Sequence, residues 1–359
     1  MITKKSDFPI WKTKTTGVTK RFDLNDTASR REYFDAKAGP EIKALREYLK
    51  DKTFVSFLMG KKNSGKGTYS KLFMEAIGGD HFKHLSVGDL VRDVHKSLTS
   101  DQARNDLVAF LKKHYRGFHS PEETLELIEG RNQTSLISTE LIIALIEFEL
   151  SRHSHKALFI DGFPRAMDQV NYSIYLKRLI GYRDDPDMLV FINVPEAVID
   201  ERIKFRVICP KCQTPRNTKL NVTKFVGFDE SSGKFYIMCD NPACDKARMV
   251  PKEGDEQGIE PIRARLEMDD KVFAHLLGLH GIDKVYLRNS MPADKALDYV
   301  DDYELTPEYY FEKAADGSIK TLEKPWTIKD DDGTVSHSLL PAPVAIGLIK
   351  QTAKVLGLV

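Results

Sequence analysis

The chain has 359 residues, with 54 basic and 53 acidic side chains and a net charge of +1. This length allows a sizeable core and more than one domain, and the charge balance gives no global attraction to nucleic acid or to an anionic membrane. There is no apolar run long enough to cross a bilayer, and the N-terminus has no apolar signal region. We therefore expect a cytoplasmic monomer that binds neither nucleic acid nor membranes.

In chain order, residues 1–52 are polar and mixed, and we expect them to form an N-terminal extension. Residues 53–59 (TFVSFLM) predict a buried strand, because the run is short, apolar and rich in β-branched and aromatic residues. A glycine-rich loop follows, and residues 66–77 predict a helix. Further buried strands are expected, with helical patterns between them, at 157–161, 187–194 and 284–288. Strands that alternate with helices are typical of a parallel α/β sheet flanked by helices.

Other segments depart from this alternation. Residues 93–135 have a charged helical pattern and are predicted to be an insertion. Residues 207–258 contain all four cysteines, together with Pro, Gly and Asn. The tail from about 301 to 359 contains Trp326 and an apolar helical pattern, and we expect a C-terminal extension there.

The loop Gly60–Thr68 (GKKNSGKGT) nearly matches the phosphate-binding motif G-x-x-x-x-G-K-[ST]. Backbone N–H groups at a helix N-terminus form an anion cradle, and Lys66 would add a mobile charge on the phosphates. Asn63 stands where such loops often have Gly, and Asn tolerates a positive φ better than most residues. Lys61 and Lys62 either attract the anion or are solvated charges, and we favour the second interpretation.

The same loop differs from the motif in the residue after its lysine. Gly67 follows Lys66, so Thr68 comes one place too late to put its hydroxyl on magnesium in the usual way. A different residue must therefore help to hold the metal.

The cysteines form two pairs, with spacings C-x2-C and C-x4-C: Cys209 and Cys212, then Cys239 and Cys244. In a cytosolic protein this clustering favours a metal over disulfides, and four thiolates form a tetrahedral structural zinc site. Such a zinc would have no open position for catalysis. A disulfide or free thiols are the alternatives.

Several motifs follow one another along the chain: GKGT at 65–68, LSVGDLVR at 85–92, DGFPR at 161–165 with Gln169, ERIKFR at 201–206, and IRARL at 262–266. In this order they resemble the adenylate kinase family of nucleoside monophosphate kinases. The resemblance covers roughly residues 53–300. It implies a P-loop nucleoside triphosphate hydrolase-like core at 53–300, with an inserted monophosphate-binding subdomain at 83–150 and a zinc lid at 207–258.

The resemblance also implies an activity, the reversible transfer ATP + AMP ⇌ 2 ADP, with Mg²⁺ and a structural Zn²⁺ as cofactors. This chemistry needs the two phosphates to be positioned in line and the charge on the transferring oxygens to be cancelled, rather than a covalent intermediate. The planar, always charged guanidinium of arginine is suited to both tasks. The residues with implied catalytic roles are Lys66, Asp161, Arg165, Arg202, Arg206 and Arg265.

Nucleotide contacts follow from the same resemblance. Those implied for ATP are Gly60, Asn63, Ser64, Gly65, Lys66, Gly67, Thr68, Arg202, Arg206 and Met291, the last in a strip, Asn289–Met291, whose backbone would touch the adenine. Those implied for AMP are Val87, Arg92, Ser135, Ile137, Gly162, Arg165, Gln169 and Arg265. The Phe163–Pro164 bond is expected to be cis.

Magnesium in this family is held mostly by phosphates and water. Asp161, at the carboxyl end of a predicted core strand, is expected to hold those waters, with Asp89 as the second candidate. The usual lid arginine has two possible counterparts, Arg248 and Lys252, between which the sequence does not choose.

The choice of acceptor base rests on two residues. Gln169 offers a donor and an acceptor that match adenine. Val87 stands where the family usually has Thr, and pyrimidine-selective relatives have a small apolar residue there. The alternatives are therefore a UMP or CMP kinase and, from another class, a non-catalytic nucleotide-binding module that docks a partner. The full set of arginines argues against the non-catalytic module.

Overall fold

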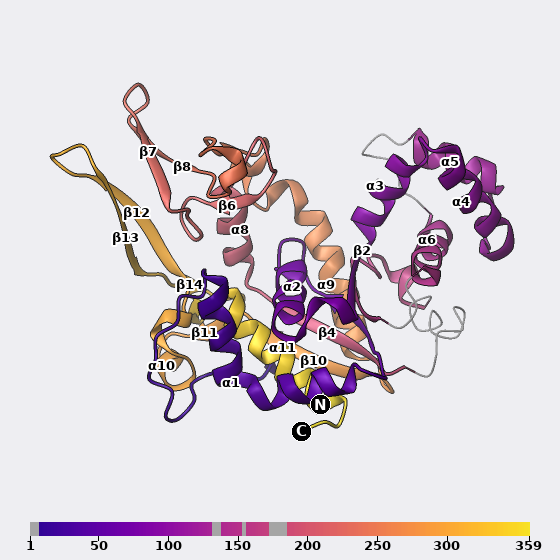
Figure 1. The fold of residues 1–359 in the computed structure, drawn as a ribbon, viewed down its shortest axis with the longest axis horizontal. Coiled ribbons are helices and arrows are strands. Elements are labelled where there is room, and N and C mark those ends of the chain that lie inside the picture. Colours follow the sequence, from indigo (N-terminus) through magenta and orange to yellow (C-terminus); the bar gives the residue numbers. More distant parts are fainter. Residues whose placement is uncertain (1–6, 131–137, 153–155, 172–184) are drawn as a thin grey trace.

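The computed structural model describes residues 7–130, 138–152, 156–171 and 185–359, and a five-stranded parallel sheet forms its centre (Figure 1). In spatial order the strands are β10 (Asp283–Arg288), β4 (Asp187–Asn193), β1 (Val55–Met59), β3 (Ala157–Asp161) and β2 (Phe82–Ser86). The four predicted strands are confirmed. The fifth, β2, was not predicted as a strand.

Both faces of this sheet are buried, which explains why its inner strands read as continuous apolar runs. Along β1, Leu58 packs in one hydrophobic cluster while Phe57 and Met59 pack in another, because successive side chains point to opposite faces. The first cluster contains residues of α1 (Thr27–Tyr48), α2 (Lys66–Ile77), α8 (Glu196–Lys204) and α11 (Pro341–Val355). The second contains residues of α3 (Val87–Ser97), α4 (Asp101–His114), α5 (Pro121–Glu129), α6 (Thr139–Ser151) and α9 (Arg263–Leu277). The expected class, a P-loop-type α/β core flanked by helices, is confirmed.

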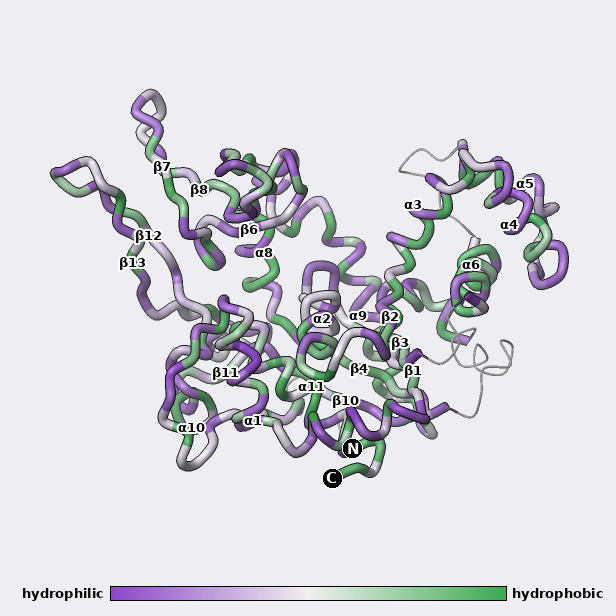
Figure 2. Tube along the Cα trace, viewed as in Figure 1, coloured by the Kyte–Doolittle hydropathy of each residue, from purple (hydrophilic) through white to green (hydrophobic). Residues whose placement is uncertain are grey.

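The two flanking segments of the sequence complete one face of this core. Helix α11 packs against α1, α2 and β10, and Ala345, Leu348 and Ile349 in it are fully buried. Figure 2 shows hydrophobic residues along α11 and the central strands. None of the helices within the described ranges is long and apolar enough to cross a membrane.

The chain between β10 and α11 forms an appendage with its own strands. It contains β11 (Ser290–Pro292), α10 (Ala296–Tyr299), β12 (Pro307–Lys313), β13 (Ile319–Pro325), β14 (Ile328–Lys329) and β15 (Val335–Ser338). Strands β11, β15 and β14 form an antiparallel sheet, and β12 pairs with β13 in a long hairpin. The expected boundary near residue 301 falls inside this appendage.

A buried polar network joins the appendage to the N-terminal segment. The Glu304 carboxylate is fully buried and accepts hydrogen bonds from the Thr13 hydroxyl (2.6 Å), the Tyr33 hydroxyl and the Asp301 N–H (2.6 Å). Nearby, the Lys37 ammonium lies 2.6 Å from the Asp301 carboxylate. Hydrogen bonding on this scale offsets the cost of burying the carboxyl group.

The helices α3 to α6 project from the end of β2 (Figure 1). Serine hydroxyls cap all four at their N-termini, and Ser120 with Glu123 forms a capping box on α5. In its described part, residues 93–130, the predicted charged insertion contains the end of α3 followed by α4 and α5, whose apolar side chains pack into the second cluster.

A small domain follows α8. It contains β5 (Arg206–Ile208), β6 (Pro215–Asn217) and β9 (Val250–Pro251) in one sheet, and a hairpin of β7 (Phe225–Asp229) and β8 (Lys234–Met238). The β12–β13 hairpin of the appendage packs beside it (Figure 1). The rings of Phe235 and Phe311 lie 5.6 Å apart, and the Tyr309 N–H donates to the Lys219 carbonyl at 2.7 Å.

Candidate active site

The loop Gly60–Thr68 joins β1 to α2 and closes in the expected way. Gly65, the N-cap of α2, has φ +97°, and Asn63 has φ +66°, which confirms that Asn takes a left-handed position here. A Cβ on Gly60 would lie 2.9 Å from the Ile192 carbonyl oxygen, so only glycine fits at the loop entrance. The cis Phe163–Pro164 bond is also confirmed.

Lys66 folds back over this loop. Its ammonium donates to the carbonyl oxygens of Gly60 (2.9 Å) and Lys61 (3.0 Å), and it lies 3.7 Å from Asp161 Oδ1. Burial lowers the pKa of Lys66, while the charge of Asp161 acts in the opposite direction. Asp161 ends β3, directly beside Leu58 of β1, so the parallel register brings the carboxylate to the loop.

The prediction that Lys61 is a solvated charge is wrong. Its side chain is 6% exposed, and its ammonium lies 2.7 Å from Glu196, 3.1 Å from Asp270 and 3.8 Å from Asp331. These carboxylates come from α8, α9 and the appendage, far apart in the sequence. Lys61 therefore anchors the loop to three distant segments.

Two cavities meet at Lys66 and Asp161, which line both of them. The larger has a volume of about 670 Å³, and its loop end is lined by Asn63, Gly65, Lys66, Gly67, Thr68, Asp161, Arg202 and Arg206. The smaller, about 30 Å³, lies on the other side, against Gly60, Gly162, Arg165, Arg265 and Asp269. Arginine side chains therefore lie on both sides of the same lysine.

The arginines on the larger cavity are held in different ways. Arg202 lies over the loop, with Nη1 3.4 Å from the Asn63 carbonyl oxygen and 3.5 Å from that of Ser64. Arg206 forms two hydrogen bonds with the Asp255 carboxylate. Ser64 itself is buried beneath the loop.

Met291 does not lie on this cavity. Its side chain is 1% exposed in the core, and β11 pairs with β15 through Ser290–Ser338 and Met291–His337. The strip expected to touch the adenine is thus paired with β15 and buried in the core. The segment that leads into α11 lines the larger cavity instead: Ser338, Leu339, Leu340, Pro341 and Ala342.

Two further arginines converge above the N-terminus of α3. A Cβ on Gly88 would lie 3.5 Å from Arg165 Nη2 and 3.6 Å from Arg92 Nη1. Gly162, with φ +84°, allows Arg165 to approach, because a Cβ there would lie 2.4 Å from Arg165 Nη2. Asp89 forms an ion pair with Arg92, so Asp161 rather than Asp89 lies beside Lys66.

The residues expected around the acceptor base are only partly gathered. Gln169 is 6% exposed; its Oε1 accepts from the Arg165 N–H at 2.6 Å and its Nε2 donates to Thr139 Oγ1 at 3.2 Å. Val87 is buried in the second hydrophobic cluster. Ser135 and Ile137 lie outside the described residues.

Asp269 on α9 was missed by sequence reasoning. It lines the smaller cavity with Arg265, whose Nε lies 4.0 Å from its Oδ2, and it accepts from the Lys62 N–H at 3.0 Å. Burial raises the pKa of this carboxyl, against the charges of Arg265 and Lys66. Its position four residues after Arg265, one helical turn along, is the signal that could have revealed it.

The two candidates for the lid cation lie in different places. Arg248 forms an ion pair with Asp229 at 3.1 Å and packs over the ring of Tyr236, within the β7–β8 hairpin. Lys252 lies closer to the loop, since burial and the charges of Arg265 and Lys252 together lower the pKa of Lys62.

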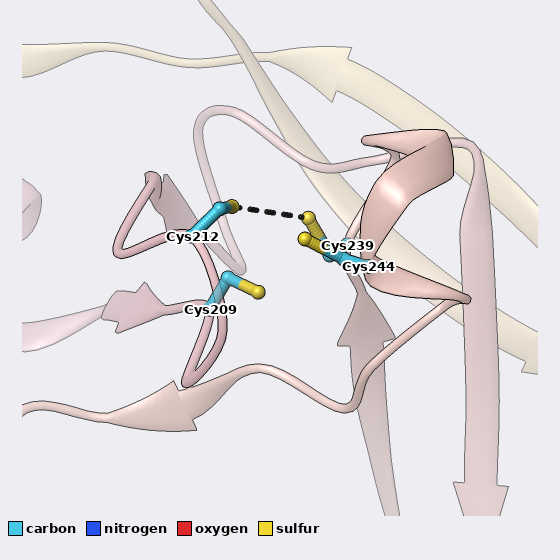
Figure 3. A group of neighbouring side chains, drawn as sticks. All are labelled: Cys209, Cys212, Cys239 and Cys244. Atoms are coloured by element: carbon cyan, nitrogen blue, oxygen red, sulfur yellow. Dashed lines mark hydrogen bonds between the residues drawn. The ribbon is translucent and has the colours of Figure 1, made fainter.

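The four cysteines come together in the small domain (Figure 3). The sulfur atoms of Cys209, Cys212, Cys239 and Cys244 all lie within 4.8 Å of one another, and those of Cys212 and Cys239 are 3.7 Å apart. A tetrahedral site with zinc–sulfur bonds of about 2.3 Å places its sulfurs about 3.8 Å apart, so the group fits zinc. All four thiols are free, which argues against the disulfide alternative. Hydrogen bonding with Thr214 lowers the pKa of Cys212 to about 6.

Comparisons with known proteins agree with this geometry. No family model matches the chain. It is 28% identical to an adenylate kinase of Anaeromyxobacter dehalogenans (strain 2CP-1 / ATCC BAA-258) over 214 residues, 59% of this chain and 80% of the relative. It is 25% identical to an adenylate kinase of Thermotoga petrophila over 252 residues, 68% of this chain and 83% of the relative.

These relatives support the adenylate kinase family. They indicate a phosphotransferase, a nucleoside monophosphate kinase.

Proposed function

We propose that the protein is an adenylate kinase that catalyses ATP + AMP ⇌ 2 ADP with Mg²⁺. One observation carries the proposal: Lys66 and Asp161 line two cavities at once, and each cavity has its own arginines. Two phosphorylated substrates could therefore meet at one lysine. In-line transfer between phosphates needs this kind of positioning and charge cancellation.

The donor would occupy the larger cavity. Its phosphates would lie on the loop N–H groups at the start of α2, where the helix dipole favours anions, with Lys66, Arg202 and Arg206 around them. Mg²⁺ bound to these phosphates would cancel part of their charge. Asp161 is the residue proposed to orient the water ligands of the metal.

The acceptor would approach from the side of α3. Arg92 and Arg165, brought together above Gly88, would hold its phosphate with planar forks. Arg265 and Asp269 line the space between this phosphate and Lys66. Gln169 would pair with the adenine, because its amide has both donor and acceptor capacity beyond the two bonds that it makes internally.

The four cysteines are proposed to bind one structural Zn²⁺, and the domain that contains them to act as the lid over the donor. The zinc would replace a hydrophobic core that so small a domain cannot build. The cytoplasmic location and monomeric state expected from the composition belong to this proposal too.

A coupled assay of ATP consumption with a panel of nucleoside monophosphates tests the function. We expect kcat/KM for AMP to exceed that for UMP or CMP by at least about tenfold, since a base that does not use the remaining donor and acceptor capacity of the Gln169 amide forgoes two hydrogen bonds of about 0.5–1.5 kcal/mol each. Gln169→Ala should narrow this gap. Equal efficiency with CMP and AMP would favour the pyrimidine kinase, and no turnover with any acceptor would favour the non-catalytic module.

A further inference from the structure

The larger cavity continues well beyond the phosphate-binding loop, along α2 as far as Leu72. Its volume of about 670 Å³ is in the range of pockets that enclose a whole small-molecule ligand. Its far end is formed largely by segments outside the region of the sequence resemblance: residues 24–25 before α1, residues 306 and 309 of the appendage, and residues 338–342 at the start of α11.

The chemistry of the far end differs from that of the loop end. Leu72, Leu220 and Leu339 supply apolar surface, and Tyr309 supplies an aromatic ring. Uncharged polar side chains also line the cavity: Asn25, Asn217, Asn221 and Thr306. Apolar and aromatic surface with uncharged polar groups beside it suits a planar heterocyclic base, which has hydrogen-bonding edges, rather than a phosphate.

The cations at this end do not change that conclusion. Arg30 is neutralised by Glu75, through Nε to Oε1 at 3.0 Å and Nη2 to Oε2 at 2.9 Å. Arg216 is neutralised by Asp240, whose two carboxylate oxygens lie 3.0 and 2.9 Å from its Nη2. At the loop end, Lys66 and Arg202 lie at the helix N-terminus that forms the anion cradle, although Arg206 there is paired with Asp255. Lys71 of α2 also lines the cavity. The anion cradle at one end and the apolar and aromatic surface at the other therefore orient a nucleotide with its phosphates at Lys66 and its base near Tyr309.

The backbone of Tyr309 is held from two sides. It pairs with Glu323 in the β12–β13 ladder, and its N–H donates to the Lys219 carbonyl of the small domain at 2.7 Å. Tyr310, the next residue, points to the opposite face of the strand and is 40% exposed. Only Tyr309 of the two lines the cavity.

We propose that Tyr309 and Asn25 form the base-binding wall for the donor nucleotide and determine its selectivity, with the Tyr309 ring packing against a purine. This inference rests on the proposed function, which places the donor in the larger cavity. It assigns a substrate-binding role to two segments for which the sequence suggested none.

Steady-state kinetics on the full-length, zinc-loaded enzyme test the proposal. Tyr309→Ala should raise the KM for ATP roughly tenfold, the size of one base–aromatic contact, while the KM for AMP stays within about twofold. Tyr309→Phe keeps the ring and should retain the wild-type KM for ATP within about twofold. The matched control is Tyr310→Ala, which should change neither KM.

Asn25→Ala provides a second test, in case Tyr309→Ala disturbs the folding of the hairpin. Asn25 is exposed and lies in a different segment, before α1. It should raise the KM for ATP by about threefold without changing the melting temperature. The proposal is overturned if Tyr309→Ala and Asn25→Ala both leave the KM for ATP within about twofold of wild type. Failure of the proposed function is a different result, the absence of turnover in wild type. In that case, equilibrium dialysis with ATP would still test the base-binding wall. If Tyr309→Ala and Asn25→Ala bound ATP as tightly as wild type, the proposal would be overturned.

Discussion

The guanidinium of Arg206 donates two hydrogen bonds to the carboxylate of Asp255, from Nε to Oδ2 at 2.5 Å and from Nη2 to Oδ1 at 2.7 Å. Arg206 begins β5, where the chain enters the small domain, and Asp255 lies just after β9, where the chain returns. The pair therefore joins the two ends of this domain. It also fixes the planar guanidinium of Arg206 at the edge of the larger cavity.

Asp255→Asn should disturb this fork without removing the arginine. An amide keeps one acceptor oxygen but loses the negative charge, so it no longer offers an acceptor to both Nε and Nη2 of the guanidinium. We expect kcat/KM for ATP to fall about tenfold. The control is Asp229→Asn, which weakens the ion pair between Arg248 and the β7–β8 hairpin. Equal losses in the two variants would mean that the Arg206–Asp255 pair has no special role.

Lys66→Met should remove most of the activity while the fold is kept. The ammonium is a preorganised charge between the two cavities, and loss of one such group at a reacting centre typically costs ~10²–10³ in kcat. Lys43→Met, at an exposed position on α1, is the control for loss of a positive charge. Near-native turnover of Lys66→Met would exclude the phosphate-loop assignment.

Arg165→Ala should weaken the acceptor more than the donor. Arg165 lies with Arg92 above Gly88 and does not line the larger cavity. We expect the KM for AMP to rise at least about tenfold, with the KM for ATP within about twofold. The exposed Arg152 provides the control substitution. If only the KM for ATP changed, the two sites would have to be exchanged.

Elemental analysis of carefully purified protein should find one zinc per chain. The proposed ligands are thiolates, so zinc binding should weaken as the pH falls. A strong chelator should lower the melting temperature of the small domain while the core stays folded. Cys212→Ser and Cys244→Ser should each lose most of the metal, whereas Thr214→Val, beside Cys212, should keep it. Protein that contains no metal would contradict this prediction.

Glu304 should make stability depend on pH. Burial is the largest cause that raises the pKa of this carboxyl above its ordinary 4.5, so the folded chain binds the proton more tightly than the unfolded chain. The resulting stabilisation is complete below pH about 4.5 and is lost as the pH rises through the raised pKa.

We therefore expect the melting temperature of wild type, relative to that of Glu304→Gln, to fall as the pH increases from about 4.5 to 8. Glutamine does not titrate, so the difference isolates this one group. Glu312→Gln, at an exposed position on β12, should show no such trend. A difference that is constant with pH would show that Glu304 has the same pKa in both states.

Local features of the site could be predicted from neighbouring residues. The strand, loop and helix around GKKNSGKGT depend on an apolar run, on glycines at tight positions and on Asn63 at a positive φ, all within a few residues of one another. The two cysteine pairs likewise predicted a metal site, because the short spacing within each pair brings its two sulfurs close together, and the fold then joins the pairs.

Features that depend on distant segments were decided only when the chain folded. Lys61 looked like a solvated charge because its partners Glu196 and Asp331 lie more than a hundred residues away along the chain, and burial by those partners cannot be read from a local pattern. Met291 was expected on the donor cavity, but β15 pairs over its strip and brings Leu339 there instead. Long-range strand pairing and burial depend on the whole fold, and they place residues 338–342, rather than the predicted strip, against the cavity.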